Sequence, residues 1–332
     1  MNNAINVLIC GQVRQDALFR SALERFQSYR ATGVMDRIVF STWTGEIDKY
    51  DGMRDHLAAT SVEVVETVMP TTFMESQGNF YYQATQATNG LERFSSDDAI
   101  FKTRGDVRIN FALDFKACKE FWERQDREHP VVGEHLQHRI AVGGCAPFIP
   151  FWFEDRYFYG ICSDLRKLVR LSRAGDILWN PQTAIAEVRW FATIFTELFP
   201  VVRHIMRIFW MLRLHPHDPA VYNTGIVYRS IAVYHHIVET FFTMGVEPQC
   251  VDRSAFKDTI EPPPAPVGYI PDVVTDAIKA QPAYVETRAA LAAEGTAYLS
   301  RPDVTNSFRE AINQLGRETI KIYGDFVQPV AC

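Results

Sequence analysis

An apolar run, Ala99–Phe101, is followed at once by a charged cluster, Lys102-Thr103-Arg104-Gly105-Asp106-Val107-Arg108. The apolar run predicts a buried strand. Charged residues are rare at the end of a core strand unless they form ion pairs or bind a ligand. The carboxylate of Asp106 could bind a divalent metal or a sugar hydroxyl, and Arg104 and Arg108 could bind a phosphate. A structural ion pair at the end of the strand is the alternative that these residues leave open.

Polar residues also follow two earlier apolar runs, over residues 6–10 and 37–41. The residues at these two places are Gly11, Gln12, Arg14, Ser41, Thr42 and Trp43. Ligands bind at the carboxyl ends of the strands in parallel α/β sheets, so we expect these residues and Lys102–Asp106 to converge at one edge. No G-x-G-x-x-G and no G-x-x-x-x-G-K-[ST] motif is present, which argues against a dinucleotide-binding dehydrogenase and a P-loop NTPase.

A third group of polar residues, Gln83, Gln86 and Asn89, occurs at intervals of three within a predicted helix. This spacing places the three amides on one face of the helix. They could orient a bound ligand, or they could cap and solvate the helix. Trp43, Tyr81, Tyr82 and Tyr157 could likewise stack on a sugar or a base, although packing in the core is the commoner use of aromatic residues.

The elements that would position these residues alternate along the first half of the chain. Apolar runs predict strands over residues 6–10, 37–41 and 62–68, and again from Ala99. Amphipathic spacing predicts helices over residues 16–29 and 81–94. Repeated strand–helix units of this kind predict an α/β, Rossmann-type fold with a mainly parallel sheet flanked by helices.

The second half of the chain has a different pattern. Its predicted elements are an aromatic strand over residues 157–160, a helix from Ser163, a helix over 181–195 that carries Glu187, a late strand over 222–228 and a helix over 230–244. Pro262–Pro266 forms a stiff connector, and residues 272–326 are predicted to be mostly helical. The expected parts are a domain over 1–260 with halves at 1–115 and 140–260, a proline-rich connector at 261–270, and a helical C-terminal extension at 271–332.

Composition and charge restrict the class of protein. The formal net charge of −6 argues against a general nucleic-acid-binding protein, which needs a basic surface. Six cysteines without C-x-x-C spacing favour reduced thiols and a cytoplasmic location over a disulfide scaffold or a zinc ribbon. The N-terminus lacks the basic start and apolar region of a secretory signal, and no run of about 20 uncharged apolar residues predicts a transmembrane helix.

One segment, Arg203–Arg213, mixes arginines with large apolar residues. Such a segment could lie on an anionic membrane surface, which would place the protein at the inner face of the membrane. A core helix whose arginines extend to solvent is the alternative. We therefore treat the segment as a candidate for peripheral membrane contact.

Taken in order, these motifs resemble those of the WavE-type lipopolysaccharide-synthesis glycosyltransferases, a bacterial family. The resemblance rests on Cys10–Arg14, Ser41–Gly45, Asn79–Gln83, Gln86–Leu91, Phe101–Ile109, Asp155–Gly160 with Asp164, and Ala186-Glu187. It extends over about residues 5–230. It implies a GT-A-like fold with a nucleotide-sugar half in residues 1–115 and an acceptor half in residues 140–260.

The resemblance implies transfer of a sugar from a nucleotide-activated donor to a surface polysaccharide or lipopolysaccharide. In GT-A-like enzymes an acid at a strand end binds the divalent metal (Mn²⁺ or Mg²⁺) that bridges the donor diphosphate, and Asp106 matches that position. The neighbouring acid of the family pattern is replaced here by Arg104. Arg104 or Arg108 could therefore offset the phosphate charge instead, or the donor could be a sugar linked to a monophosphate, which needs no metal.

Glycosyl transfer by inversion also needs a base that accepts the proton of the acceptor hydroxyl. Asp155 and Glu187 are the candidates for this role, with Glu154 as a further acid, and a solvated or salt-bridged carboxylate is the alternative for each. The residues expected to bind the donor are Gly11, Gln12, Arg14, Ser41, Thr42, Trp43, Gln83, Asn89, Lys102, Thr103, Arg104 and Asp106. The expected partners are a nucleotide-sugar donor and a glycan or glycolipid acceptor.

Two other functions stay open from the sequence. The first is a non-catalytic protein of the same fold that binds a nucleotide or a glycan, because the metal motif is incomplete. The second is a membrane-attached scaffold that uses Arg203–Arg213. Hydrolysis of the donor would distinguish the enzyme from the binding protein, and liposome binding without nucleotide binding would identify the scaffold.

Overall fold

A computed structural model describes residues 4–70, 80–105, 115–131, 136–142, 157–169, 194–214, 225–244 and 272–323. Contacts divide these residues between two units. The first, the sheet unit, draws them from 1–146, 151–194 and 237–264, and the second, the helical unit, from 195–236 and 265–332. We expected residues 140–260 to form one half of a single domain, whereas the contacts divide this stretch between the two units.

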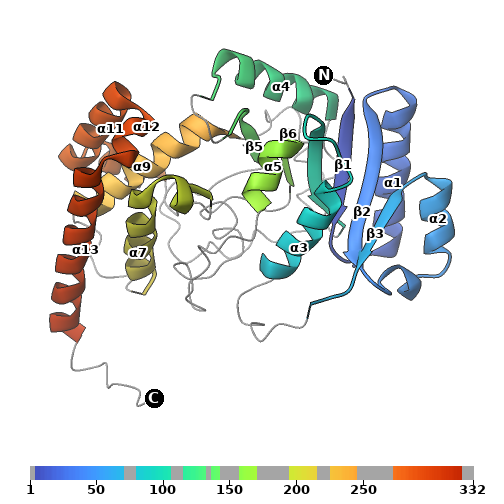
Figure 1. The fold of residues 1–332 in the computed structure, drawn as a ribbon, viewed down its shortest axis with the longest axis horizontal. Coiled ribbons are helices and arrows are strands. Elements are labelled where there is room, and N and C mark those ends of the chain that lie inside the picture. Colours follow the sequence, from blue (N-terminus) through green and yellow to red (C-terminus); the bar gives the residue numbers. More distant parts are fainter. Residues whose placement is uncertain are drawn as a thin grey trace. The chain divides into compact units, whose positions relative to one another are not determined.

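The sheet unit contains seven described strands in the order β3-β2-β1-β4-β6-β5-β7. Figure 1 shows β1, β2 and β3 side by side, with α1 next to them. Their bounds are β1 Ile5–Cys10, β2 Met35–Trp43, β3 Glu63–Thr67, β4 Ala99–Arg104, β5 Ile140–Val142, β6 Tyr157–Ile161 and β7 Phe242–Met244. Strand β6 is antiparallel to β4 and β5, and every other pair of described neighbours is parallel. The prediction of an α/β fold with a mainly parallel sheet is confirmed within the described residues.

The helices of the sheet unit connect and cover these strands. They are α1 Asp16–Ala31, α2 Met53–Ala59, α3 Phe80–Leu91, α4 Phe115–Glu128 and α5 Cys162–Val169, with a short 3-10 helix η1 at Ile47–Lys49. The strands and helices predicted in the first half of the chain match β1, β2, β3, β4, α1 and α3 within a few residues. Residues 181–193 of the helix predicted to carry Glu187, and the connector 261–270, lie outside the described residues.

The helical unit contains the C-terminal helices together with two earlier ones. Their bounds are α7 Pro200–Leu214, α9 Gly225–Phe241, α10 Asp272–Lys279, α11 Pro282–Glu294, α12 Thr296–Ser300 and α13 Pro302–Tyr323. The last residues of α9 group with the sheet unit. Within the helical unit α7 packs against α12 and α13. The prediction of a mostly helical C-terminal region is confirmed as far as Tyr323.

The strand predicted over residues 222–228 is wrong for its described part, because α9 begins at Gly225. The β-branched residues Ile226 and Val227 favour a strand locally. Their burial belongs to a helical pattern, since Ser230, Ile231 and Tyr234 are also buried at intervals of three and four. Packing of this helical face therefore overrides the local preference.

Helix α7 shows how the segment Arg203–Arg213 is used. Val201, Val202, Ile205 and Ile208 are buried, whereas Arg203 and Arg207 are exposed. The first half of the segment is thus a core helix with exposed arginines, and its contact with a membrane stays a prediction. No helix in the described part of the chain combines the length and the apolar character needed to cross a membrane.

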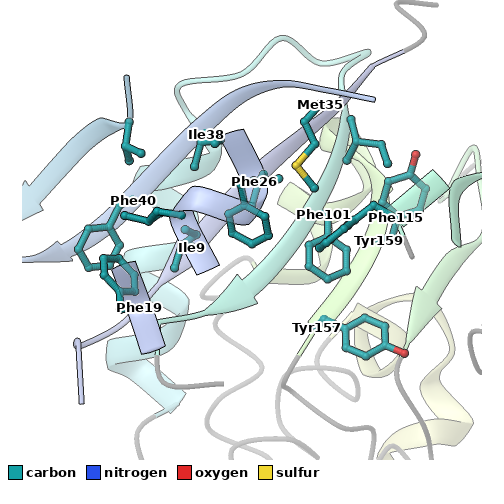
Figure 2. Packing of buried hydrophobic residues seen from close by; sticks show 14 of the residues in the cluster. Ile9, Phe19, Phe26, Met35, Ile38, Phe40, Phe101, Phe115, Tyr157 and Tyr159 are labelled. Atoms are coloured by element: carbon teal, nitrogen blue, oxygen red, sulfur yellow. The ribbon is translucent and has the colours of Figure 1, made fainter. Parts of the chain in front are cut away.

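One face of the sheet is closed by aromatic side chains from the strands and from α1 and α4. The buried ring of Phe101 on β4 lies 4.8 Å from the ring of Phe115 and 5.5 Å from that of Tyr157 (Figure 2). In the same cluster the rings of Phe19 and Phe40 are 4.9 Å apart. Aromatic pairs at such separations stabilise a core beyond the area that they bury. This face of the sheet is therefore filled by packing.

The opposite face carries the polar side chains of the strands. Side chains alternate along a strand, so Lys102 lies on the face opposite Phe101. Lys102 is paired in register with Leu8 of β1 and with Phe158 of β6, and its Nζ lies over the Phe158 ring. Cys10, two residues after Leu8, shares this face with Lys102.

Helix α3 approaches this second face closely at Gly90. A Cβ atom on Gly90 would lie 2.3 Å from Leu8 Cδ1 and 3.1 Å from Ser41 Cβ, so a side chain does not fit there without a shift of its neighbours. Ser41 Oγ donates a hydrogen bond of 2.7 Å to the carbonyl oxygen of Gln86. These contacts fix α3 above β1 and β2.

Replacing Gly90 by alanine is expected to destabilise the protein, although alanine favours a helix by up to about 1 kcal/mol over glycine. The new methyl group meets the buried Leu8 side chain, and overpacking of a core typically costs about 1–3 kcal/mol. The measurement is urea denaturation of Gly90→Ala, Leu8→Ala and the double variant. Leu8→Ala removes the obstructing Cδ atoms, so Gly90→Ala should cost less in that background. An equal cost in both backgrounds would contradict the close approach.

Candidate functional site

The first four strands of the sheet create a switch point between β1 and β4. The chain proceeds from β1 outward to β2 and β3 on one side and then crosses to β4 on the other. In α/β sheets, ligands bind outside the carboxyl ends of the strands at such a point. Here β1 ends at Cys10 and β4 ends at Arg104, and these residues are paired in register. The N–H of Gly105 donates a hydrogen bond of 3.0 Å to the carbonyl oxygen of Cys10, which holds the two strand ends together.

A cavity of about 180 Å³ lies at these strand ends. Its walls come from the ends of β1, β2 and β4, from the chain just after β3, and from α3. The lining residues are Cys10, Gly11, Gln12, Arg14, Trp43, Met69, Tyr82, Gln83, Gln86, Lys102 and Arg104. All of them belong to the sheet unit.

Three of the lining residues carry a positive charge: Arg14, Lys102 and Arg104. Lys102 is 2% exposed, and its Nζ lies 4.5 Å from the centre of the Phe158 ring in a cation–π contact. None of the described residues that line the cavity is a carboxylate. A lining of this kind favours an anionic ligand such as a phosphate.

Cys10 lines the same cavity as a neutral thiol. Burial raises the pKa of Cys10 from 9.0 to about 11, against the opposing effect of the charge on Lys102. At neutral pH the thiol is therefore protonated, and it offers neither a nucleophile nor an anionic ligand.

Two glutamines of α3 bring buried polar atoms to the cavity. Gln83 Oε1 and Gln86 Nε2 are buried, and neither has a hydrogen-bond partner among the described residues. Gln86 is 2% exposed, and a buried polar atom without a partner costs about 1–3 kcal/mol. One atom is an acceptor and the other a donor, so a sugar hydroxyl or the edge of a base would satisfy both.

Trp43 and Tyr82 form the aromatic side of the cavity. Their ring centres are 5.7 Å apart in an edge-to-face arrangement. The neighbouring side chains of Met69 and Tyr81 are 46% and 43% exposed. Aromatic and apolar side chains of this kind are suited to the flat face of a base or a sugar ring.

The loop after β1 is held in place by hydrogen bonds from β2. Thr42 Oγ1 donates to the carbonyl oxygen of Gly11 (2.8 Å), and the N–H of Gly11 donates to the carbonyl oxygen of Ser41 (3.1 Å). Gly11 has a φ of +108°, a conformation that residues with a side chain rarely adopt. Ser41 and Thr42 therefore shape this loop but are not among the residues that line the cavity.

The structure brings seven of the twelve residues predicted to bind the donor to the cavity. They are Gly11, Gln12, Arg14, Trp43, Gln83, Lys102 and Arg104. Thr103 is buried and paired with Ile9 and Tyr157, which belong to the aromatic core. Asn89 Nδ2 donates a hydrogen bond of 2.9 Å to Thr67 Oγ1 and does not line the cavity.

The remaining predicted residues, Asp106, Asp155 and Glu187, lie outside the described residues, as does Glu154. Four lining residues, Cys10, Met69, Tyr82 and Gln86, were not among the twelve, although Tyr82 and Gln86 had been named as residues that could contact a ligand. The alternation of β1 places Cys10 on the same face as Leu8 and was the available signal for it. Met69 carries no comparable signal, because it is an apolar residue beyond the end of a strand.

The described residues that line the cavity offer the divalent metal that the resemblance implies amide oxygens such as Gln83 Oε1, three cations and no carboxylate, which is a poor set of ligands. Ammonium and guanidinium groups have no lone pair to offer as ligands, and Mn²⁺ and Mg²⁺ prefer carboxylate, carbonyl and water oxygens. Within the described ranges, no group of three or more His, Cys, Asp or Glu side chains is placed to hold a metal ion. Asp106, the predicted metal ligand, is not part of those ranges.

A second polar cluster lies at the start of β5. The carboxylate of the buried Asp164 accepts hydrogen bonds from the N–H groups of Gln137 and His138. His138 Nδ1 lies 2.8 Å from Asp126 Oδ2, and Asp126 Oδ1 accepts the N–H of Arg139 (2.8 Å). Both carboxylates thus hold the backbone that leads into β5, which is a structural role.

The stability of the protein is expected to fall at alkaline pH. Burial raises the pKa values of Cys10 and Cys162 from 9.0 to about 11, so the folded state binds these protons more tightly than the unfolded state. This stabilisation is complete below about pH 9 and is lost as the pH rises to about 11. The free energy of unfolding, measured across that range, should fall less steeply in Cys10→Ala/Cys162→Ala. Identical slopes would contradict the raised pKa values.

Comparison with known proteins found no family model and no curated protein that matches this chain. The cavity at the β1–β4 switch point is the described site that offers ligand chemistry.

Proposed function

We propose that this protein is a glycosyltransferase with a GT-A-like fold, which moves a sugar from a nucleotide-activated donor to a surface polysaccharide or lipopolysaccharide acceptor. The observation that carries the proposal is the cavity at the β1–β4 switch point, where three cations line one space with two amide atoms, Gln83 Oε1 and Gln86 Nε2, that have no hydrogen-bond partner among the described residues. The mainly parallel sheet and the order of the motifs in the first half of the chain support it.

The cavity suits the phosphate-bearing part of such a donor. Its volume of about 180 Å³ is below the ~300–1,000 Å³ of typical small-molecule sites, so it holds a part of the donor and not the whole. The phosphates would lie against Arg14, Lys102 and Arg104. A base or sugar ring would extend toward Trp43 and Tyr82.

The cations of the cavity fit the charge that develops during glycosyl transfer. The bond between the anomeric carbon and a phosphate oxygen breaks, and the nucleotide leaves with added negative charge. Lys102 and Arg104 would stabilise that charge, and the burial of Lys102 strengthens its electrostatic effect. The proton of the acceptor hydroxyl would pass to a carboxylate in an inverting reaction, for which Asp155 and Glu187 stay our candidates.

A cytoplasmic location is part of the proposal. It is supported by the cysteines Cys10, Cys118 and Cys162, which are buried and not in disulfide bonds. The exposed arginines Arg203 and Arg207 of α7 are candidates for contact with anionic lipids at the inner face of the membrane.

The proposed donor site predicts selective stabilisation by one class of nucleotide-sugar. In a thermal-shift screen with UDP-, GDP-, dTDP- and CMP-sugars, we expect one class to raise the melting temperature. Binding to the folded state stabilises it by about 2.7 kcal/mol at a hundredfold excess over the dissociation constant. No shift with any class, from protein that is folded, would contradict the donor site.

Gln86→Leu is expected to weaken binding of the selected nucleotide-sugar by about tenfold, because it removes a hydrogen bond to the ligand. The free energy of unfolding should stay the same or rise, since the variant also removes a buried donor without a partner. Gln27→Leu is the matched control, because Gln27 lies on α1 and donates to the carbonyl oxygen of Thr60. It should lower stability by about 1 kcal/mol and leave binding unchanged. Unchanged nucleotide-sugar binding by Gln86→Leu, together with weaker binding by Gln27→Leu, would contradict the proposed role of Gln86.

A non-catalytic nucleotide- or glycan-binding protein is the second candidate, because the same cavity would serve it. Slow hydrolysis of the selected nucleotide-sugar in the absence of acceptor distinguishes the two. A transferase releases free sugar and nucleotide over time, whereas a binding protein shows affinity without turnover.

A further inference from the structure

We infer that fixed cations, Lys102 with Arg14 and Arg104, hold the phosphate groups of the ligand and that binding there requires no divalent metal ion. The inference rests on the proposed function for the identity of the ligand. It departs from the metal-bridged donor that the sequence resemblance implies.

The three cations reach one cavity from separate points of the chain. Arg14 follows the end of β1, Lys102 lies within β4, and Arg104 is the last residue of β4. The pairing of Cys10 with Arg104 sets the distance between the two strand ends. The positive charges are therefore built into the sheet at its switch point, where anionic ligands are expected.

Lys102 is the most unusual of the three. Lys102 is 2% exposed and lines the cavity, a degree of burial that is rare for a lysine. The ring of Phe158, which is fully buried on the neighbouring strand, lies 4.5 Å from its Nζ and forms a cation–π contact with it. A charge held out of bulk water interacts more strongly with a phosphate oxygen than a surface lysine does.

A divalent ion would be poorly served in the same space. It would stand beside three positive charges, and the described lining offers it no carboxylate. Cys10 is present as a neutral thiol, since burial raises its pKa to about 11, and a neutral thiol is a weak metal ligand. The cations can supply the charge neutralisation for which a metal is otherwise used.

The first test measures binding with and without metal. The full-length protein is titrated calorimetrically with the nucleoside diphosphate of the selected class, and separately with inorganic pyrophosphate, in excess EDTA and again with Mn²⁺ or Mg²⁺. The expected result is the same dissociation constant, within about threefold, in EDTA and with metal. Binding that occurs only with metal would overturn the inference and leave the proposed function intact.

The second test removes the cations one at a time in EDTA. Arg14→Gln and Arg104→Gln should each weaken pyrophosphate binding by about tenfold or more, because each removes charge-assisted hydrogen bonds. Lys102→Met should weaken it further, and Lys102→Arg should retain part of the affinity. Arg127→Gln, on the exposed surface of α4, is the matched control and should have no effect. If Lys102→Met fails to fold, the two arginine variants decide the outcome.

The remaining outcomes separate the inference from the proposed function. Affinities of the arginine variants equal to that of Arg127→Gln would overturn the inference. Pyrophosphate binding without binding of any nucleotide would support the cation site and overturn the proposed function. Absence of binding by both probes, with and without metal, would overturn both.

Discussion

The parallel pairing of β1 with β4 is the constraint on which the site depends. It places Cys10 opposite Arg104, and the hydrogen bond from Gly105 to Cys10 extends the pairing past the ends of both strands. The loop that begins at Gly11 after β1 and the charged end of β4, Lys102 and Arg104, thereby line one cavity. The two strands are separated by almost ninety residues of sequence, so this juxtaposition exists only in the folded sheet.

The two faces of the sheet have different roles: one is packed as a core, and the other carries polar groups at the cavity. The face under α1 and α4 is closed by aromatic rings such as Phe101, Phe115 and Tyr157, which bury apolar area without polar cost. The face under α3 carries the buried Lys102 and the buried Nε2 atom of Gln86, which has no hydrogen-bond partner among the described residues and therefore opposes folding. Such a cost is expected where a protein keeps polar groups ready for a ligand.

Local patterns were sufficient for most elements of the sheet unit. Alternating strand and helix signals predicted β1, β2, β3, β4, α1 and α3, because each buries a regular apolar face that shows in its own sequence. The pattern failed at Gly225–Tyr228, where β-branched residues predicted a strand and a helix formed. It also could not show that α7 groups with the C-terminal helices, since that choice depends on which surfaces meet.

For the site, residue types and spacing predicted the kind of chemistry, namely polar and charged residues at strand ends and three amides at helical spacing. The fold then sets which of these residues share a cavity. Met69 lines the cavity in the folded protein. Ser41 and Asn89 instead form hydrogen bonds with Gln86 and Thr67 that stabilise the surrounding structure. The reason is physical, because residue type fixes charge and hydrogen-bonding capacity, whereas register, strand order and the close approach of α3 at Gly90 fix position.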